Sequence, residues 1–223
     1  MKDLKKENHK SLNIIEIFSS IQGETSLSGL PTTFIRLAAC NLRCTWCDTT
    51  YSFGRGEKVS MEQIVGQVES NGCPYVCITG GEPLLQNDVH SLMKILCDKG
   101  YTLSVETGGS LPTDKVDPRV ITILDIKCPG SGMSERNHWS NLDKLRDHDE
   151  VKFVIQDKED YAYAIEVCNK FKLFQRGKFV LFSPVFDELD PKELVQWILN
   201  DKIPARLNLQ IHKFIWSPET IGV

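Results

Sequence analysis

Short apolar runs alternate with amphipathic stretches along most of this chain. Runs rich in β-branched and aromatic residues are typical of buried strands, whereas apolar residues three and four positions apart indicate helices. Strands separated by helices favour a parallel sheet, and the pattern leaves open whether that sheet is open or closed toward a barrel. The runs predict strands at 32–38, 75–79, 101–105, 120–126, 151–155, 178–182 and 206–211.

Three of the stretches between these runs carry signals for the start of a helix. Ser60 and Gln63 have the form of a capping box, in which each side chain bonds to the backbone of the other. The segment 86–97 repeats apolar residues at helical spacing and stops before Gly100. The residues 190–193, Asp-Pro-Lys-Glu, open a third helix because proline suits the first helical position.

Length and charge limit the classes of function. A chain of 223 residues with 41% hydrophobic content is most simply one domain over 1–223. The net charge is −4 and the lysines are scattered, so there is no basic surface of the kind that binds nucleic acid. No apolar run is long enough to cross a bilayer, and the first ten residues lack an apolar signal segment. We therefore expect a cytoplasmic protein with free thiols and no nucleic-acid or membrane partner.

Three closely spaced cysteines carry most of the functional information. Cys40, Cys44 and Cys47 follow the predicted strand 32–38 in a C-x3-C-x2-C pattern. A structural zinc site is normally closed by four ligands, and an electron-transfer iron–sulfur cluster by four cysteines. Three thiolates on a four-iron cluster leave one iron open, which indicates catalysis. A zinc site that takes a fourth ligand from a distant residue remains an alternative on spacing alone.

Polar and glycine-rich residues gather at the predicted carboxyl ends of the strands. Ligands of parallel α/β folds bind at that rim, although any one such residue also fits an ordinary turn. Their occurrence together with the cysteines predicts one site. These strand ends carry Cys40, the residues 79–83 (Thr-Gly-Gly-Glu-Pro), 106–108 (Glu-Thr-Gly) and 183–184 (Ser-Pro), Lys127, Gln156 and His212.

The cysteine spacing and the Gly-Gly-Glu-Pro turn at 80–83 together resemble the radical S-adenosylmethionine superfamily. Within it, further segments in the same order are similar to the 7-carboxy-7-deazaguanine synthase family, and they span nearly the whole chain. The resemblance implies a shortened, partial β/α barrel that commonly forms a homodimer. It places a cluster loop near 40–56 and a substrate-contacting segment near 206–223. The segments that carry it are 14–24, 33–40, 47–49, 105–107, 125–127 and 209–213.

The same resemblance implies a carbon–nitrogen lyase of queuosine and deazapurine biosynthesis. Its reaction converts 6-carboxy-5,6,7,8-tetrahydropterin to 7-carboxy-7-deazaguanine with loss of ammonia. The implied cofactors are a 4Fe-4S cluster held by three cysteines, S-adenosylmethionine and Mg2+, with an external electron donor such as flavodoxin or ferredoxin. Two alternatives remain. Another small radical enzyme, such as a glycyl-radical activase, would keep the three cysteines but would not need residues that bind a pterin. A non-catalytic metal-binding module would have no open iron.

Individual roles also follow from the resemblance. Cys40, Cys44 and Cys47 hold the cluster, and Thr49 binds Mg2+, for which a hydroxyl oxygen is an acceptable ligand. The expected cofactor-binding residues are Trp46, Gly80, Gly81, Glu82, Glu106, Thr107, Lys127, Ser131 and Gln156.

The expected substrate-binding residues suit a carboxylated pterin. A carboxylate accepts paired N–H groups of an amino-pyrimidinone, and a guanidinium matches a carboxylate in two-point geometry. Whether Val223 reaches the substrate stays open, because 213–223 runs well past the last of these residues. The expected substrate-binding residues are Gln22, Gly23, Glu24, Arg36 and His212. The other cysteines are assigned to packing, and they are Cys73, Cys77, Cys97, Cys128 and Cys168.

Overall fold

The computed structural model describes residues 10–177, 179–218 and 220–223, and its strands form one nine-stranded sheet. The order is β3-β1-β2-β4-β5-β6-β7-β8-β9, with parallel pairing from β2 to β9 and antiparallel pairing of β1 with β2 and β3. β3 and β9 are its edges, so the barrel is partial and not closed. The strands are β1 Ser11–Ile21, β2 Pro31–Leu37, β3 Glu57–Ser60, β4 Tyr75–Gly80, β5 Thr102–Thr107, β6 Ile121–Ile126, β7 Glu150–Ile155, β8 Phe179–Pro184 and β9 Arg206–Leu207.

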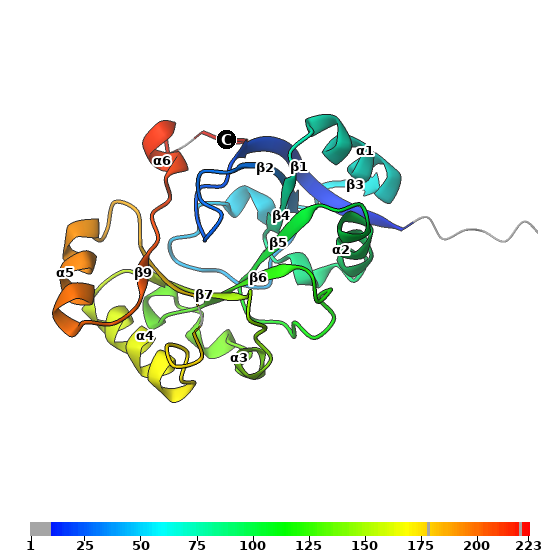
Figure 1. Ribbon diagram of the computed structural model, residues 1–223. Helices are drawn as coiled ribbons and strands as arrows, with labels where there is room; N and C mark the ends of the chain where they lie inside the picture. Colours follow the sequence, from blue (N-terminus) through cyan, green and yellow to red (C-terminus); the bar gives the residue numbers. More distant parts are fainter. Residues whose placement is uncertain (1–9, 178, 219) are drawn as a thin grey trace, which may run out of the picture.

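Helices cover the outer side of the curved sheet (Figure 1). The short 3-10 segments are Thr50–Phe53, Pro83–Leu85, Pro129–Ser131 and Ser134–Arg136. Among the described residues, no helix is long and apolar enough to span a membrane. The α-helices are α1 Met61–Asn71, α2 Val89–Asp98, α3 Ser140–Asp143, α4 Lys158–Lys170, α5 Pro191–Asp201 and α6 His212–Ile215.

Two of the expected helix starts are confirmed in detail. The Ser60 side chain accepts the Gln63 N–H, and the Gln63 side chain accepts the Ser60 N–H at 3.0 Å, as the capping box requires. Asp190 caps α5 by accepting the Lys192 N–H at 2.8 Å, with Pro191 at the first helical position. These caps fix where α1 and α5 leave the sheet.

Two apolar clusters hold the helices against the sheet. The first joins β1, β2, β4 and β5 to α1 and α2, and the second joins β6, β7 and β8 to α4 and α5. The interiors of the parallel strands β2 to β8 are mostly buried, as expected for a parallel sheet covered by helices. Both clusters leave the carboxyl ends of the strands free for polar residues.

The structure differs from the sequence prediction at four segments. The apolar pattern does not predict β1 and β3. The predicted strand 206–211 is a strand only over Arg206–Leu207, because Ile211 then donates its N–H to the Gly23 carbonyl and the chain leaves the sheet. The predicted helix 86–97 begins at Val89, because the Gln86 side chain bonds to the backbone of β1. Residue 178, the predicted start of one strand, lies outside the described residues.

Candidate active site at the carboxyl ends of the strands

A cavity of about 550 Å³ lies at the carboxyl ends of the parallel strands. Most of the site residues expected from the sequence line it, although they come from segments as far apart as β1 and α6. Three expected cofactor residues are not among the lining residues, namely Glu82, Ser131 and Gln156. The expected residues that do line it are Gln22, Gly23, Glu24, Arg36, Cys40, Cys44, Trp46, Cys47, Thr49, Gly80, Gly81, Glu106, Thr107, Lys127 and His212.

The cluster loop is docked on the segment that follows β6. The Thr45 hydroxyl donates to the Gly130 carbonyl at 2.8 Å, and the Thr45 N–H donates to the Ser131 carbonyl at 3.2 Å. A Cβ on Gly130 would lie 3.1 Å from the Trp46 ring, so the indole packs directly against this backbone. Trp46 therefore anchors the loop while also lining the cavity.

The three cysteines of the cluster loop share one cavity. Cys40, Cys44 and Cys47 are unpaired and line the same cavity. Within the described residues, however, no three His, Cys, Asp or Glu side chains converge on one point as the ligands of a single ion do. Thiolates that bind three different irons need not converge in this way. The three thiols that line one cavity are compatible with a cluster held by three cysteines.

The glycines of the Gly-Gly-Glu turn allow it to approach β2 and the cluster loop. Gly80 has φ +140°, and a Cβ there would lie 2.2 Å from the Leu37 carbonyl oxygen. A Cβ on Gly81 would lie 2.1 Å from the Ala39 carbonyl oxygen and 2.8 Å from Cβ of Cys40. Any larger residue would push the turn away from the first cysteine.

Glu82 holds this turn to the end of β5. Its buried carboxylate accepts the Leu84 N–H at 3.0 Å, the Thr107 hydroxyl at 2.8 Å and the Gly108 N–H at 2.8 Å. Burial raises the pKa of Glu82, although these donors and Lys127 oppose the shift. The geometry makes Glu82 a residue that positions the turn from behind, since it is buried and does not line the cavity.

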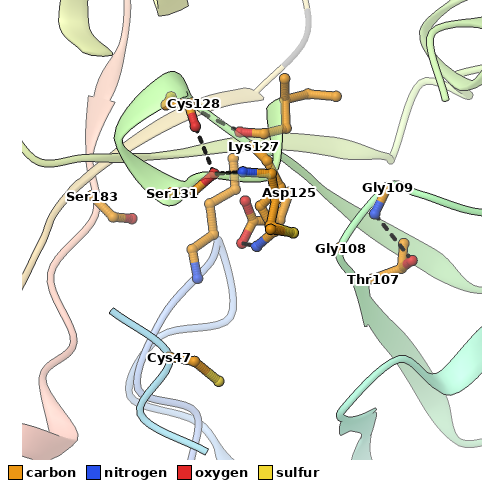
Figure 2. Close-up of polar contacts among 12 residues, drawn as sticks. Cys47, Thr107, Gly108, Gly109, Asp125, Lys127, Cys128, Ser131 and Ser183 are labelled. Atoms are coloured by element: carbon orange, nitrogen blue, oxygen red, sulfur yellow. Dashed lines mark hydrogen bonds and ion pairs between the residues drawn. The ribbon is translucent and has the colours of Figure 1, made fainter. Parts of the chain in front are cut away.

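Ser131 and Gln156 do not line the cavity, and their side chains bond to other residues. The Ser131 hydroxyl donates to the Cys128 carbonyl at 2.6 Å and accepts the Met133 N–H at 3.1 Å, as Figure 2 shows. The Gln156 side chain donates to Glu188 at 2.7 Å. Glu188 does line the cavity, so Gln156 is one contact away from it.

Lys127 and Asp125 project from the end of β6. Their side chains form an ion pair of 2.9 Å, while the second oxygen of Asp125 is buried without a hydrogen-bond partner among the described residues. Burial would lower the pKa of Lys127, but Asp125 and Cys44 raise it above its ordinary value. Figure 2 shows both residues at the end of β6 together with Thr107 of β5, Ser183 of β8 and Cys47 of the cluster loop. The pair thus places one cation beside the cysteines.

Glu24 lies on the other side of the cavity, within a set of polar partners. Lys152 of β7 donates to its Oε2, the Gln210 amide donates to Oε1 at 2.8 Å, and the Asn208 amide donates to Oε2 at 3.4 Å. Glu106 of β5 faces the same region, where it accepts from Gln22 at 3.4 Å. Glu106 thus bonds to a residue of the expected substrate set.

Arg36 keeps most of its guanidinium available to the cavity. Its Nε donates to Glu16 at 2.7 Å, and the group lies 5.9 Å from the Phe18 ring centre and 5.8 Å from that of Tyr51. Neither terminal nitrogen has a hydrogen-bond partner in the described part of the chain. Tyr51 also donates to Glu16 at 2.9 Å, so the carboxylate fixes the arginine from behind. This leaves a planar pair of N–H donors for a ligand carboxylate.

The C-terminal segment closes the same side. His212 lines the cavity, and burial lowers its pKa despite the opposing charge of Glu24. Lys213 forms an ion pair of 2.9 Å with Asp48, next to Cys47 in the sequence. Val223 is also a lining residue. The segment near 206–223 therefore meets both the cluster loop and the β1–β2 connection.

Several polar lining residues have no role that the sequence predicts. One sequence signal could have identified Lys152 as a functional residue, because it is a charged residue inside an otherwise apolar strand. Asp125 was visible only as part of a family segment. The contacts of the others depend on the path of the chain after β9, which the strand pattern does not predict. These residues include Asp48, Asp125, Lys152, Gln210 and Lys213.

The remaining cysteines do not line this cavity, although the Cys77 thiol donates to the lining residue Glu106 at 3.5 Å. Cys77, Cys128 and Cys168 are buried, and Cys73 and Cys97 are half-buried. None of the five is among the residues that line the cavity. Their positions agree with packing roles.

Comparisons with known proteins agree with this geometry. Residues 34–125 match the model of the radical SAM superfamily, whose members use a 4Fe-4S cluster and S-adenosylmethionine. The Escherichia coli QueE crystal structure superposes with a TM-score of 0.73 at 22% identity, covering 90% of this chain and 94% of that one, which supports the partial-barrel fold.

Sequence relatives are more informative about the family. The 7-carboxy-7-deazaguanine synthase of Koribacter versatilis is 43% identical over 226 residues, covering 95% of this chain and all of the relative. That of Chlorobaculum tepidum is 42% identical, covering 95% of this chain and 97% of the relative. The chain therefore belongs to the 7-carboxy-7-deazaguanine synthase family of the radical SAM superfamily.

Proposed function

We propose that this chain converts 6-carboxy-5,6,7,8-tetrahydropterin to 7-carboxy-7-deazaguanine with loss of ammonia. The observation that carries the proposal is that the three cysteines and all five expected pterin-binding residues line one cavity. Neither a glycyl-radical activase nor a metal-binding module needs the five pterin-binding residues. Family membership supports the same reaction.

The cofactor side of the cavity is the side of the cluster loop. Cys40, Cys44 and Cys47 would hold the 4Fe-4S cluster, and the turn at Gly80 and Gly81 would present backbone to the methionyl part of S-adenosylmethionine. When bound, these cofactors supply one-electron cleavage of the sulfonium and a radical that abstracts hydrogen from the pterin. The protein shields this chemistry by packing Trp46 against the segment after β6.

The substrate side is formed by the β1–β2 connection and the segment after β9. Glu24 would accept the N–H groups of the amino-pyrimidinone, and Arg36 would bind the pterin carboxylate through its terminal nitrogens. His212 faces the ring as a neutral imidazole, because burial lowers its pKa. We place Glu106 on this side as well, because its carboxylate bonds to Gln22.

Mg2+ is the third proposed component. The Thr49 hydroxyl lines the cavity, and its nearest polar contact in the structure is a long one of 3.8 Å to the Cys47 sulfur. That leaves its oxygen available to a hard cation, whose other ligands would be water and substrate oxygens. The ion would orient the pterin relative to the cofactor side.

The remaining proposals concern partners and location. An external one-electron donor such as flavodoxin or ferredoxin would reduce the cluster, and the enzyme would act as a cytoplasmic homodimer. Four large apolar side chains at the C-terminal side are exposed and would suit a subunit contact. They are Tyr51, Phe214, Ile215 and Ile221.

Anaerobic incubation tests the proposed reaction. The reconstituted protein would be supplied with carboxytetrahydropterin, S-adenosylmethionine, Mg2+ and a reductant, and the products would be identified by mass. We expect 5′-deoxyadenosine or recycled S-adenosylmethionine together with a product that has lost ammonia. A four-iron cluster requires about four iron and four sulfide per chain. If the protein has this content but does not convert the pterin, the proposed reaction is contradicted and the radical enzyme class is retained.

A further inference from the structure

Lys152 has an unusual position for a lysine of a parallel strand. It comes from the middle of β7, its side chain is 11% exposed, and it lines the cavity. Lysine is rarely buried to this degree without a partner, because removing an ammonium from water is costly. Its ammonium donates to Oε2 of Glu24, so the cost is offset by an ion pair inside the substrate side.

The partners of this pair fix its geometry from two further elements. Asn208 donates to Oε2 of Glu24 and also to the Ser183 hydroxyl at 2.8 Å, while its own oxygen accepts the Thr25 N–H at 2.8 Å. Gln210 donates to the other carboxylate oxygen at 2.8 Å. The carboxylate is consequently held in one orientation by a cation and two amides.

The charges around Lys152 are mainly negative. Glu106 of β5 and Asp125 of β6 face it in addition to Glu24, and each of the three attracts its ammonium. Lys152 therefore balances one of several carboxylates in a confined region. Removal of this cation would leave Glu24 held only by the amides of Asn208 and Gln210, so the carboxylate would lose one of the three contacts that fix its orientation.

We infer that Lys152 is a positioning residue that holds the Glu24 carboxylate in the orientation that meets N–H donors, and so makes the site select a 2-amino-4-oxopyrimidine edge over a 2,4-dioxo edge. The inference rests on the proposed function. An ionised carboxylate accepts the amino and ring N–H groups of a pterin but repels the additional carbonyl of a lumazine. Without the ion pair, the Glu24 side chain would be free to turn away from the pyrimidine edge, and the selection would be lost.

Binding of two oxidised, fluorescent analogues tests this directly. They are 6-carboxypterin and 6-carboxylumazine, which differ in the group at position 2, and they would be titrated into anaerobically reconstituted enzyme with S-adenosylmethionine present. We expect wild type to prefer the pterin by about 30-fold or more, the range for loss of a charge-assisted contact. We expect Lys152→Met to reduce that ratio to near one and Lys152→Arg to restore part of it.

Control measurements separate this role from a general effect on folding. Lys192→Met changes an exposed lysine of α5 and should retain the wild-type ratio. Iron content and S-adenosylmethionine binding should remain normal in Lys152→Met. A wild-type ratio in Lys152→Met would overturn the inference.

A double variant keeps the inference testable if Lys152→Met is too unstable. Glu24→Gln/Lys152→Met removes both charges of the ion pair together, so neither member is left buried without the other. We expect it to bind 6-carboxypterin as Glu24→Gln does, because Lys152 acts through Glu24. A further loss of about 10-fold or more in the double variant would show an independent role and overturn the inference. Failure of wild type to convert carboxytetrahydropterin would instead contradict the proposed function.

Discussion

The imidazole of His212 lies against the α-carbon of Gly23, so closely that a Cβ at residue 23 would be 1.9 Å from Nδ1. The adjoining backbone is joined as well, because the Ile211 N–H donates to the Gly23 carbonyl at 2.9 Å. Glycine at this position is therefore required by the packing of α6 and not by a turn.

Gly23→Ala should displace His212 and reduce pterin turnover without affecting the cluster. The added methyl group cannot be accommodated unless the ring or the backbone moves, and a displacement of about 1 Å in an active site can cost about 100-fold in rate. The measurement is kcat/KM for carboxytetrahydropterin beside iron content. Turnover equal to wild type would show that the contact has no part in the site.

The pKa of His212 predicts a stability change at acidic pH. Burial lowers the pKa below its ordinary value of 6.5, so the folded protein favours the neutral ring. The neutral ring contributes to the free energy of unfolding above pH 6.5, and this contribution is lost as pH falls through the lowered pKa of the folded state. Thermal melts from pH 7.5 to 5 should show a larger loss for wild type than for His212→Gln. An equal loss of melting temperature in wild type and His212→Gln would contradict a buried neutral imidazole.

The three cysteines of the cluster loop should differ sharply from the other thiols. Cys40→Ala, Cys44→Ala or Cys47→Ala should remove the oxygen-sensitive cluster and all S-adenosylmethionine cleavage. Cys73→Ala and Cys168→Ala provide matched controls, since neither lines the cavity. Iron analysis and 5′-deoxyadenosine formation measure both effects. Full cleavage by Cys44→Ala would exclude it as a cluster ligand.

Arg36→Ala should weaken binding of the carboxylated pterin. Its terminal nitrogens are open to the cavity, and loss of a two-point charged contact costs about 2–5 kcal/mol. Arg36→Lys should recover little, because an ammonium lacks the planar fork. Binding of 6-carboxypterin and of unsubstituted pterin would be compared. An equal loss for both ligands would place the guanidinium away from the carboxylate.

Thr49 provides the test of the proposed magnesium site. Thr49→Ala should retain cluster and S-adenosylmethionine binding but lose most stimulation by Mg2+, because the hydroxyl ligand is removed. Thr49→Ser keeps the oxygen and should retain a useful fraction of product formation. Product would be titrated against Mg2+ after chelation. Identical titrations for Thr49→Ala and wild type would contradict the assignment.

Local sequence signals predicted the central sheet better than its margins. The parallel strands from β2 to β8 are confirmed apart from small differences in their ends, because their apolar runs are strong and their cores are buried on both faces. β1 was missed since it mixes polar and apolar residues and pairs antiparallel at the sheet margin. The segment after β9 was misread because its path depends on distant partners such as Gly23 and Asp48.

The same difference between local sequence signals and distant contacts applies to the candidate site. Residues in family segments, such as Cys40 and Arg36, were anticipated because those segments can be read locally. Lys152 was not, since its importance depends on the contact with Glu24, 128 positions away in the sequence. The buried bonds of Glu82 likewise required the positions of Thr107 and Gly108. Sequence therefore identified residue types, whereas tertiary contacts separated cavity-lining residues from those that support them.

The ion pair between Asp48 and Lys213 joins positions 165 residues apart. At a synthesis rate of about 5–20 residues per second, the cysteine loop leaves the ribosome roughly 8–33 s before its C-terminal partner. During that interval, neither Lys213 nor His212 can cover the loop. Delivery of iron and sulfide to a nascent chain would therefore build the cluster on a surface open to oxygen, whereas delivery after release would build it within a closed pocket. The timing of cluster insertion relative to translation is thus constrained by where this ion pair falls in the sequence.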